Sequence, residues 1–343
     1  MFLKKIINFF GKDLAMDLGT ANTLLYTAKD GIVLNEPSVV ALDARTAKVL
    51  AVGYEAKEFL GRTPERIKAV RPLKDGVIAD FEVTKIMISY FIKKVIKGLQ
   101  LVKPKMVICV PTGITQVEMR AVIESAQQAG AREVKLIEEP MAAAIGAQLP
   151  IEKPKGNMVV DIGGGTTEVA VISLSAVAYA ESVRVAGDEL NEAIQRYLKE
   201  KYKVLIGENL AEQIKINLGC AFYEPSEEMK VMKVTGKNIM NGAPSMIELT
   251  EEEIAHCIKE PVDIIVDSVI RALEKTSPQL VADVAQNGIL LAGGGALLRR
   301  LDKLIMKRAN INVVVDEDPL TTVVRGTGIA MENEKAYAQV FIN

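Results

Sequence analysis

Apolar positions along this chain follow two kinds of pattern, and each kind recurs in both halves. Short continuous apolar runs, typical of buried strands, lie at residues 14–18, 106–110, 134–137, 158–162 and 288–291. Between them, apolar residues recur at helical spacing over residues 83–99, 115–129 and 188–202 and in a long stretch from 250. Strands that alternate with helices in two similar halves predict an α/β fold with a ligand cleft between two domains.

Turn-forming residues and caps place several boundaries of these elements. Residues 30–31 and 35–37 interrupt a β-rich stretch that we expect to continue to Val52. Gly130 closes the helix over 115–129. Thr250 and Glu253 have capping-box spacing, so we expect the long helix to begin there.

The first residues, MFLKKIINFFGK, have a different pattern from the rest of the chain. On a helix their apolar side chains fill one arc, with lysines opposite; the apolar residues are Phe2, Leu3, Ile6, Ile7, Phe9 and Phe10. This pattern predicts a helix that lies on a membrane surface, and the alternative is a helix packed on the body of the protein. Because no apolar run approaches the ~18 residues of a spanning helix, we expect that the chain does not cross a membrane.

Charge and composition exclude several classes of function. The chain of 343 residues has 42 Lys and Arg against 44 Asp and Glu, a net charge of -2 with no basic block, so nucleic acid is not an expected partner. Cys109, Cys220 and Cys257 are odd in number and far apart, as expected of buried, reduced thiols in the cytosol. His256 is the single histidine and lies in a charged helical run, so histidine-based hydrolysis and metal sites are disfavoured.

Two glycine-rich motifs carry the candidate chemistry. DLGTANT (residues 17–23) and DIGGGTTE (161–168) each follow a predicted strand and precede a second β-rich run. A strand, a tight turn and a returning strand direct turn N–H groups at one concavity, which suits phosphate oxygens, and the leading aspartate can hold a hydrated cation. One such hairpin could be a plain surface turn. Two of them predict a duplicated half-molecule that closes on one nucleotide.

A third glycine-rich segment, LLAGGGALL, places Gly293, Gly294 and Gly295 between a predicted strand and a helix that starts near Ala296. Exposed N–H groups at a helix N-terminus suit an anion, although close packing of helix on strand is an equally good reason for the glycines. None of the three segments fits G-x-G-x-x-G, so a Rossmann dehydrogenase is disfavoured.

Together with EEPMAAAIGA (138–147), these motifs resemble the actin/Hsp70/sugar-kinase ATPase superfamily in order and spacing. The linking segments resemble the MreB-type bacterial actins more closely, and the likeness covers essentially the whole chain; they are NEPSVVA (35–41), GRTP (61–64), RPLKDGVIADF (71–81) and EDPLTTVVRGTG (317–328). The resemblance implies an actin-like ATPase fold in which two similar domains, each with a smaller subdomain, surround a nucleotide cleft. The implied domains are an amphipathic helix over 1–12, domain I over 13–147 with its subdomain over 32–75, domain II over 148–325 with its subdomain over 183–249, and a C-terminal helix over 326–343 that returns to domain I.

The resemblance also implies roles for single residues. Asp17 and Asp161 would hold Mg²⁺, through waters, while the loop amides bind the phosphates of ATP; the loop residues are Gly19, Thr20, Ala21, Asn22, Gly163, Gly164 and Gly165. Glu139 would orient the attacking water, assisted by Thr166, and Glu138 beside it is the less favoured alternative. The nucleoside would contact Gly293 to Ala296 and the predicted helix that carries Glu212, Gln213, Ile214 and Lys215, although Glu212 and Lys215 could be an ordinary surface pair.

The implied function is a slow, Mg²⁺-dependent ATP hydrolase whose activity is coupled to polymerisation. Its filaments would assemble on the inner face of the cytoplasmic membrane and organise cell-wall elongation and rod shape, with cell-wall elongation and membrane-scaffold proteins as partners. Leu99 and Leu101 would form a second membrane contact, and a packed helix end is the alternative for them. A soluble metabolic kinase or phosphatase of the same fold is the competing function. A chaperone is not expected, because the chain ends where the core fold does.

Overall fold

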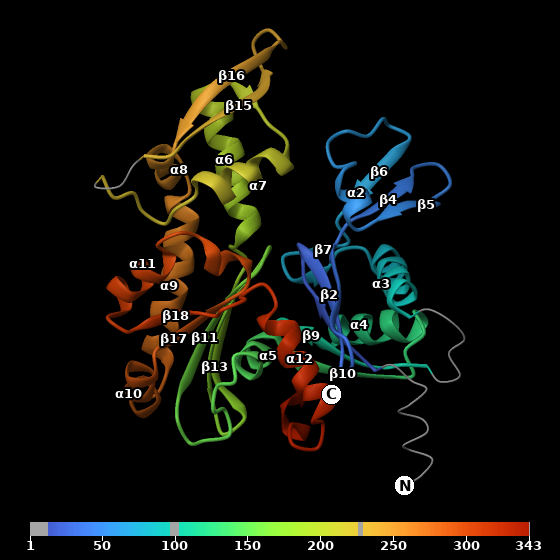
Figure 1. The fold of residues 1–343 in the computed structure, drawn as a ribbon, viewed down its shortest axis with the longest axis vertical. Helices are drawn as coiled ribbons and strands as arrows, with labels where there is room; N and C mark the ends of the chain where they lie inside the picture. Colours follow the sequence, from blue (N-terminus) through green and yellow to red (C-terminus); the bar gives the residue numbers. More distant parts are fainter. Residues whose placement is uncertain (1–12, 97–102, 226–228, 343) are drawn as a thin grey trace.

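The computed structural model describes residues 13–96, 103–225 and 229–342, and its core is a pair of sheets that stand side by side (Figure 1). The first sheet has the strand order β19-β10-β9-β1-β2-β3. Its strands are β1 (Leu14–Leu18), β2 (Asn22–Thr27), β3 (Gly31–Pro37), β9 (Lys105–Val110), β10 (Glu133–Glu138) and β19 (Phe341–Ile342). The second has the order β13-β12-β11-β17-β18. Its strands are β11 (Asn157–Ile162), β12 (Thr167–Ser173), β13 (Ala176–Val183), β17 (Ile289–Ala292) and β18 (Val313–Val315).

The two sheets repeat the same pairing in the same register. β1 pairs antiparallel with β2 and parallel with β9, and β11 pairs in the same way with β12 and β17. Asp17 lies opposite Leu24 in the first hairpin, and Asp161 lies opposite Glu168, seven residues further on in each case, in the second. The predicted duplication of a strand, turn and returning strand is therefore confirmed down to the position of the aspartate.

The helices form layers on both faces of each sheet (Figure 1). Two lie between the sheets, α5 (Glu139–Gly146) and α12 (Thr322–Glu332). The others cover the outer faces, namely α3 (Phe81–Val95) and α4 (Gln116–Gln128) on the first sheet and α9 (Lys259–Lys275), α10 (Pro278–Asn287) and α11 (Leu301–Ala309) on the second. Because the central strands are covered on both faces, they are continuously apolar rather than alternating.

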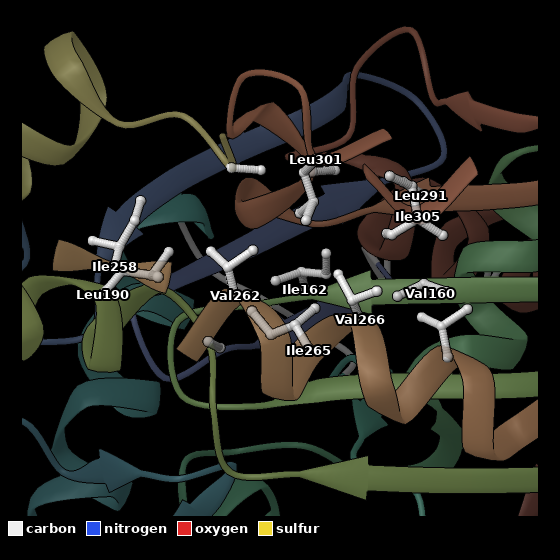
Figure 2. Packing of buried hydrophobic residues seen from close by; sticks show 14 of the residues in the cluster. Val160, Ile162, Leu190, Ile258, Val262, Ile265, Val266, Leu291, Leu301 and Ile305 are labelled. Atoms are coloured by element: carbon white, nitrogen blue, oxygen red, sulfur yellow. The ribbon is translucent and has the colours of Figure 1, made fainter. Parts of the chain in front are cut away.

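The two faces of each strand differ in side-chain size. Leu14 and Met16 face the outer core of the first sheet, while Ala15 between them faces the helices of the middle layer. In the second sheet the outer core is built from β11, α9 and α11 (Figure 2). Its members include Val160, Ile162, Val262, Val266, Leu301 and Ile305. Each fully buried side chain of this kind contributes roughly 1.5–3 kcal/mol to folding.

The middle layer depends on direct contact between the backbones of two helices. A Cβ atom on Gly326 of α12 would lie 1.8 Å from the carbonyl oxygen of Ala142 in α5. A Cβ on Gly146 of α5 would lie 2.0 Å from the carbonyl oxygen of Thr322 in α12. No side chain fits at either position, so the two helices cross with their main chains in contact. Since α5 leads from β10 to β11 and α12 leads from β18 to β19, both connections between the sheets pass through this crossing.

A smaller lobe is inserted in each half, and both lie at the same end of the molecule (Figure 1). The first contains the sheet β5-β4-β6 and α2, with a short hairpin after it. The bounds are β4 (Val40–Asp43), β5 (Val49–Val52), α2 (Tyr54–Lys57), β6 (Ile67–Val70), β7 (Leu73–Lys74) and β8 (Val77–Ile78). The second contains α6 (Gly187–Lys201), β14 (Val204–Leu205), α7 (Glu208–Leu218), β15 (Val231–Asn238), β16 (Pro244–Thr250) and α8 (Glu251–Cys257). The exact domain boundaries given from the sequence stay predictions.

Two of the predicted helices, the one from Thr250 and the one near Ala296, differ from the structure in extent. The long helix from Thr250 is two helices, α8 and α9, which meet at Ile258. Pro261 explains the break, because its ring would clash with the carbonyl four residues earlier in a continuous helix. The helix expected near Ala296 is a single 3-10 turn, η1 (Gly294–Leu297), since successive glycines have little helix propensity. The α-helix that follows, α11, begins at Leu301.

The C-terminal segment also differs from the helix predicted over 326–343. Helix α12 begins earlier, at Thr322, and ends at Glu332. A second 3-10 turn, η2 (Ala338–Val340), leads to β19, where Ile342 pairs with Leu136 of β10. Tertiary pairing with the first sheet therefore replaces helix at this end. The helix predicted over 83–99 begins at Phe81, capped by Asp80, and ends at Val95.

The membrane predictions fall mainly outside the described residues. The amphipathic segment over 1–12 and the loop residues Leu99 and Leu101 lie in the parts that the structure does not describe. Among the described residues, no helix is both long and apolar enough to span a membrane.

The helix crossing gives a test of the fold. We expect Gly326→Ala to lower the free energy of unfolding by about 2–3 kcal/mol or more, because overpacking against main chain cannot be relieved by rotating a side chain. Gly207→Ala is the control, since no atom lies within 4 Å of the added Cβ, and its cost at a helix N-cap should stay below about 1 kcal/mol. Urea unfolding of both variants decides the matter, and equal stability of the two would contradict a backbone contact at Gly326.

Candidate functional site

A cavity of about 380 Å³ lies between the two sheets, where β1 and β11 end in their glycine loops. Most of the residues singled out from the sequence line it, from all three glycine segments and from helices α5 and α7. They are Asp17, Gly19, Thr20, Ala21, Asn22, Glu139, Asp161, Gly163, Gly164, Thr166, Glu212, Lys215, Gly293, Gly294 and Gly295. Gly165, Gln213, Ile214 and Ala296 are not part of the lining.

The first two glycine loops face each other at contact distance. A Cβ on Gly164 would lie 2.8 Å from the Cβ of Ala21, and a Cβ on Gly165 would lie 3.0 Å from the amide nitrogen of Asp75. Glycine is therefore required on the second loop by the close approach of the first half of the chain. The gap between the loops is narrow enough for one ligand to contact both.

Hydrogen bonds to the loop carbonyls fix the direction of the loop amides. Ser38 Oγ donates to the Gly19 carbonyl (2.7 Å) and the Ser38 N–H donates to the Ala21 carbonyl (2.9 Å). In a trans peptide the next N–H points opposite to the carbonyl, so the amides of Thr20 and Asn22 point away from Ser38. Ser38 had no predicted role, and its only signal in the sequence was its place in the segment NEPSVVA.

The second loop is held in the same manner by the start of α6. The N–H of Gly187 donates to the Gly163 carbonyl (3.2 Å) and the N–H of Asp188 donates to the Gly164 carbonyl (2.8 Å). The first N–H groups of a helix have no hydrogen-bond partner within the helix, and two such groups of α6 donate to the carbonyls of the loop instead. The amides of Gly164 and Gly165 point the opposite way.

The third glycine segment packs directly against the aspartate of the second loop. Gly293 has φ 77°, in the left-handed region that favours glycine. A Cβ on Gly293 would lie 2.4 Å from Asp161 Oδ1, and one on Gly295 would lie 2.2 Å from Ile162 Cγ2. Close approach to Asp161 therefore requires glycine at 293, and close approach to Ile162 requires it at 295; Gly293 to Gly295 all line the cavity.

Buried carboxyl groups dominate the electrostatics of the cavity. Burial raises the pKa of Asp17 to about 6, although the Cys109 thiol, which donates to Asp17 Oδ1 (3.3 Å), opposes the shift. Burial, and then the charges of Asp17 and Glu168, raise the pKa of Asp161. Burial, and then Glu168, Asp161 and Asp17, raise the pKa of Glu139. Mutually repelling, desolvated carboxylates of this kind are stabilised by a cation.

The donor set fits a hydrated Mg²⁺ ion better than a cation held by protein ligands alone. Among the described residues, no group of three or more His, Cys, Asp or Glu side chains could hold a metal ion. Mg²⁺ commonly keeps several waters and takes one or two carboxylates together with substrate phosphates. Asp17 and Asp161 offer two such carboxylates at the mouths of the facing loops.

Glu139 and Glu138 occupy different environments. β10 ends at Glu138, which is the N-cap of α5, and Glu139 is the first residue of that helix, before Pro140. Glu139 lines the cavity and Glu138 does not. Of the two alternatives from the sequence, the structure brings Glu139 to the loops.

Several residues of the site were missed from the sequence. Glu168 is 1% exposed and accepts a hydrogen bond from the N–H of Thr112 (3.1 Å), so it joins the two halves beside Glu139. Gly76, in the hairpin β7–β8, donates its N–H to Thr20 Oγ1 (3.2 Å) and lines the cavity. Its signal was the dipeptide Asp75-Gly76, which is typical of a two-residue hairpin turn. Asp188 also lines the cavity.

Helix α7 presents one face to the cavity and is held across it by ion pairs. Glu212, Lys215, Ile216 and Gly219 line the cavity, at helical spacing. Gln213 is exposed and Ile214 is fully buried in the core, and neither lines the cavity, so their contacts with the nucleoside stay predictions. Lys57 of the first small lobe donates to Glu212 Oε2 (2.6 Å), and Arg71 pairs with Glu208. The two lobes are therefore joined above the cavity.

Comparison with known proteins places this geometry in a family context. The MreB/Mbl protein family model matches residues 11–339. The cell shape-determining protein MreB of Escherichia coli (strain K12) is 54% identical over 335 residues, which is 96% of each chain. The cell shape-determining protein Mbl of Bacillus subtilis (strain 168) is 48% identical over 325 residues, 94% of this chain and 97% of that protein.

A solved structure gives the same result for the fold. MreB5 of Spiroplasma citri bound to ADP superposes with a TM-score of 0.90 at 33% identity, covering 96% of this chain and 98% of that one. A second structure of that protein is bound to AMPPNP. The actin-like fold predicted from the motifs is confirmed.

The environment of Asp188 predicts a pH dependence. Burial raises the pKa of Asp188 from 3.8 to about 6, with Arg71 and Lys215 opposing the shift. A carboxyl group whose pKa is higher in the folded than in the unfolded state stabilises the fold while it is protonated. This stabilisation is lost as the pH rises from the pKa of the unfolded state to that of the folded state. We therefore expect the free energy of unfolding of Asp188→Asn, taken relative to that of the wild type, to be up to about 3 kcal/mol higher at pH 7 than at pH 4. Urea unfolding at both pH values measures this difference, and a gain that does not change with pH would contradict the assignment.

Proposed function

The chain belongs to the MreB/Mbl family, and from that premise we propose that it is an ATP-dependent, filament-forming bacterial actin that determines rod cell shape. The main support for the proposal is the pair of glycine loops that face each other across one cavity. The two loops have the same strand register, and hydrogen bonds hold their carbonyls on the side away from the cavity. The relatives' names, cell shape-determining protein MreB and Mbl, support the cellular role.

The loops supply the phosphate contacts. The N–H groups of Thr20 and Asn22 on one side and of Gly164 on the other donate to phosphate oxygens of ATP. Asp17 and Asp161 would hold Mg²⁺, and when bound this ion would neutralise negative charge on the phosphates of ATP. The nucleoside lies along Glu212, Lys215 and Ile216 of α7, against the third glycine segment.

Glu139 is the residue that orients the attacking water. Burial, and then the charges of its acidic neighbours, raise the pKa of Glu139, which makes its carboxylate a better acceptor for a proton of that water. Thr166, in the second loop, also lines the cavity and assists. Because phosphoryl transfer depends mainly on positioning and charge, these few groups are sufficient for a slow hydrolase.

Assembly gives this hydrolase its cellular function. We propose that copies of the chain polymerise with ATP at the inner face of the cytoplasmic membrane, with hydrolysis coupled to polymerisation. The apolar arc and the lysines of residues 2–10 support the membrane contact. Cell-wall elongation and membrane-scaffold proteins are the proposed further partners. The family match over residues 11–339 disfavours the alternative, a soluble metabolic kinase or phosphatase.

Glu139→Ala tests the catalytic assignment. We expect hydrolysis to fall by roughly 10²-fold or more, the usual effect of losing a group that handles the proton of the nucleophile, while ATP affinity persists. Glu138→Ala is the matched control, because Glu138 precedes the same helix but does not line the cavity. Phosphate release and ATP binding are measured together. Unchanged hydrolysis, or an equal loss in both variants, would remove Glu139 from this role.

Deletion of residues 2–11 tests the membrane contact. Each apolar side chain of the segment contributes at most ~1.5–3 kcal/mol on burial, and ordering the helix costs ~1–2 kcal/mol per residue, so a monomer should bind lipid weakly. A filament presents many copies, which raises binding by ~10²–10⁴. The deletion should abolish liposome flotation in the presence of ATP and leave ATP hydrolysis intact. Undiminished flotation would show that the segment packs on the protein instead.

A further inference from the structure

A buried ion cluster lies directly behind the end of α7. Glu251, the first residue of α8, has a side chain that is 2% exposed. It accepts hydrogen bonds from Arg299 Nη1 (2.8 Å) and Arg300 Nη1 (3.1 Å), and from the thiol of Cys220. Burial by itself would raise the pKa of Glu251, but the thiol and the two guanidiniums outweigh it and hold the pKa below its usual value. The carboxylate is therefore charged, and it joins α8 to the segments before α11 and after α7.

Arg299 connects this cluster to the cavity wall. Its guanidinium donates to the last carbonyls of α7, Nη2 to Leu218 (3.0 Å) and Nε to Gly219 (3.2 Å). The last carbonyls of a helix have no partner within it, and a positive charge is favourable there. The main chain makes a parallel connection, because the N–H of Ala221 donates to the Arg299 carbonyl (2.8 Å). The end of α7 and the segment at 297–299 are thus tied by both side chain and backbone.

These two tied segments are adjacent parts of the cavity wall. Ile216 and Gly219 line the cavity at the end of α7, and Leu297 to Arg299 line it beside them. The two segments meet where a Cβ on Gly219 would lie 3.1 Å from Leu298 Cδ1. The main chain at Arg300 takes a left-handed conformation (φ 64°), which is uncommon for a residue other than glycine. Its side chain is held by Glu251 and by the Phe222 carbonyl (3.0 Å), so the cluster stabilises the shape of the turn.

We propose that Glu251 is a positioning residue for the nucleoside. Through Arg299 and Arg300 it fixes the spacing between α7 and the segment at 297–299, and so it sets the fit of base and ribose without touching them. This rests on the proposed function, in which that part of the cavity binds the nucleoside. Replacing the carboxylate by a neutral amide removes the counter-ion of the half-buried Arg299 and leaves the buried Arg300 with the more distant carboxylate of Glu224 (3.6 Å), which is unfavourable and separates the two segments.

The test compares two variants of the same helix. Glu251→Gln removes the counter-ion. Glu253→Gln is the matched control, because Glu253 accepts hydrogen bonds from Tyr197 (2.9 Å) and Tyr202 (2.6 Å) and does not line the cavity. The full chain with Mg²⁺ is titrated with a fluorescent ADP analogue, which is then displaced by ADP or by inorganic tripolyphosphate. Tripolyphosphate occupies the phosphate loops alone, so the ratio of its inhibition constant to the Kd of ADP reports the nucleoside contacts.

The result expected for Glu251→Gln is a loss of ADP affinity of at least about tenfold with a change of less than about twofold for tripolyphosphate. Glu253→Gln should change neither. Arg299→Lys provides a second variant if Glu251→Gln does not fold; it keeps the charge but loses the planar fork that binds two carbonyls, and the same selective loss is expected. Equal losses for both ligands, or unchanged ADP affinity, would overturn the proposal. Failure of the unmodified chain to bind ADP at all would instead overturn the proposed function, and this inference with it.

Discussion

The contact between the backbones of α5 and α12 is the constraint on which the rest of the structure depends. Because Gly146 and Gly326 allow the helices to touch without side chains between them, the two sheets come close and their inner faces carry small residues such as Ala15. Asp17 and Asp161 lie on those inner faces and therefore converge on one cavity. The same helices begin at that cavity, since Glu139 starts α5 and Val323 of α12 lines it. A change in the crossing would move the loops and Glu139 together.

This geometry concentrates negative charge where little water is available. Asp17, Glu139 and Asp161 all have raised pKa values, and in each case burial is the largest cause. Such an arrangement lowers the stability of the fold without a cation, which is typical of functional sites that conflict with local rules. Hydrogen bonds from Ser38 and from the first residues of α6 to the loop carbonyls keep the loops in place despite this repulsion.

The sequence predicted the parts of the structure that short-range patterns determine. The runs at 14–18 and 158–162 became β1 and β11, and the glycine motifs became the facing loops, because continuous apolar runs and glycine turns have few alternative structures. Tertiary contacts decided the rest. The final strand β19 exists because Ile342 pairs with β10, and no local signal shows this. Gln213 and Ile214 were assigned to the site from a motif, but the orientation of α7 depends on the residues that it packs against. Ser38 and Glu251 act through contacts with segments that are distant in the chain, and a single sequence does not show which distant residues are in contact.

The two halves of the site differ in the residue that lies opposite the aspartate, and this difference bears on hydrolysis. Two equal hairpins supply two equal aspartates, and a symmetric pair of loops can hold phosphates from both sides. Hydrolysis needs more, because the water must approach from one direction. At the position opposite the aspartate, the first half has the apolar Leu24 and the second has Glu168. Glu168 is tied to Thr112 of the first half, and it is the strongest of the charges that raise the pKa of Glu139. In the proposed function, the repeated backbone would provide for binding, and the carboxylate of Glu168, at one of two equivalent positions, would act through Glu139 to give the site the asymmetry that a directed attack requires.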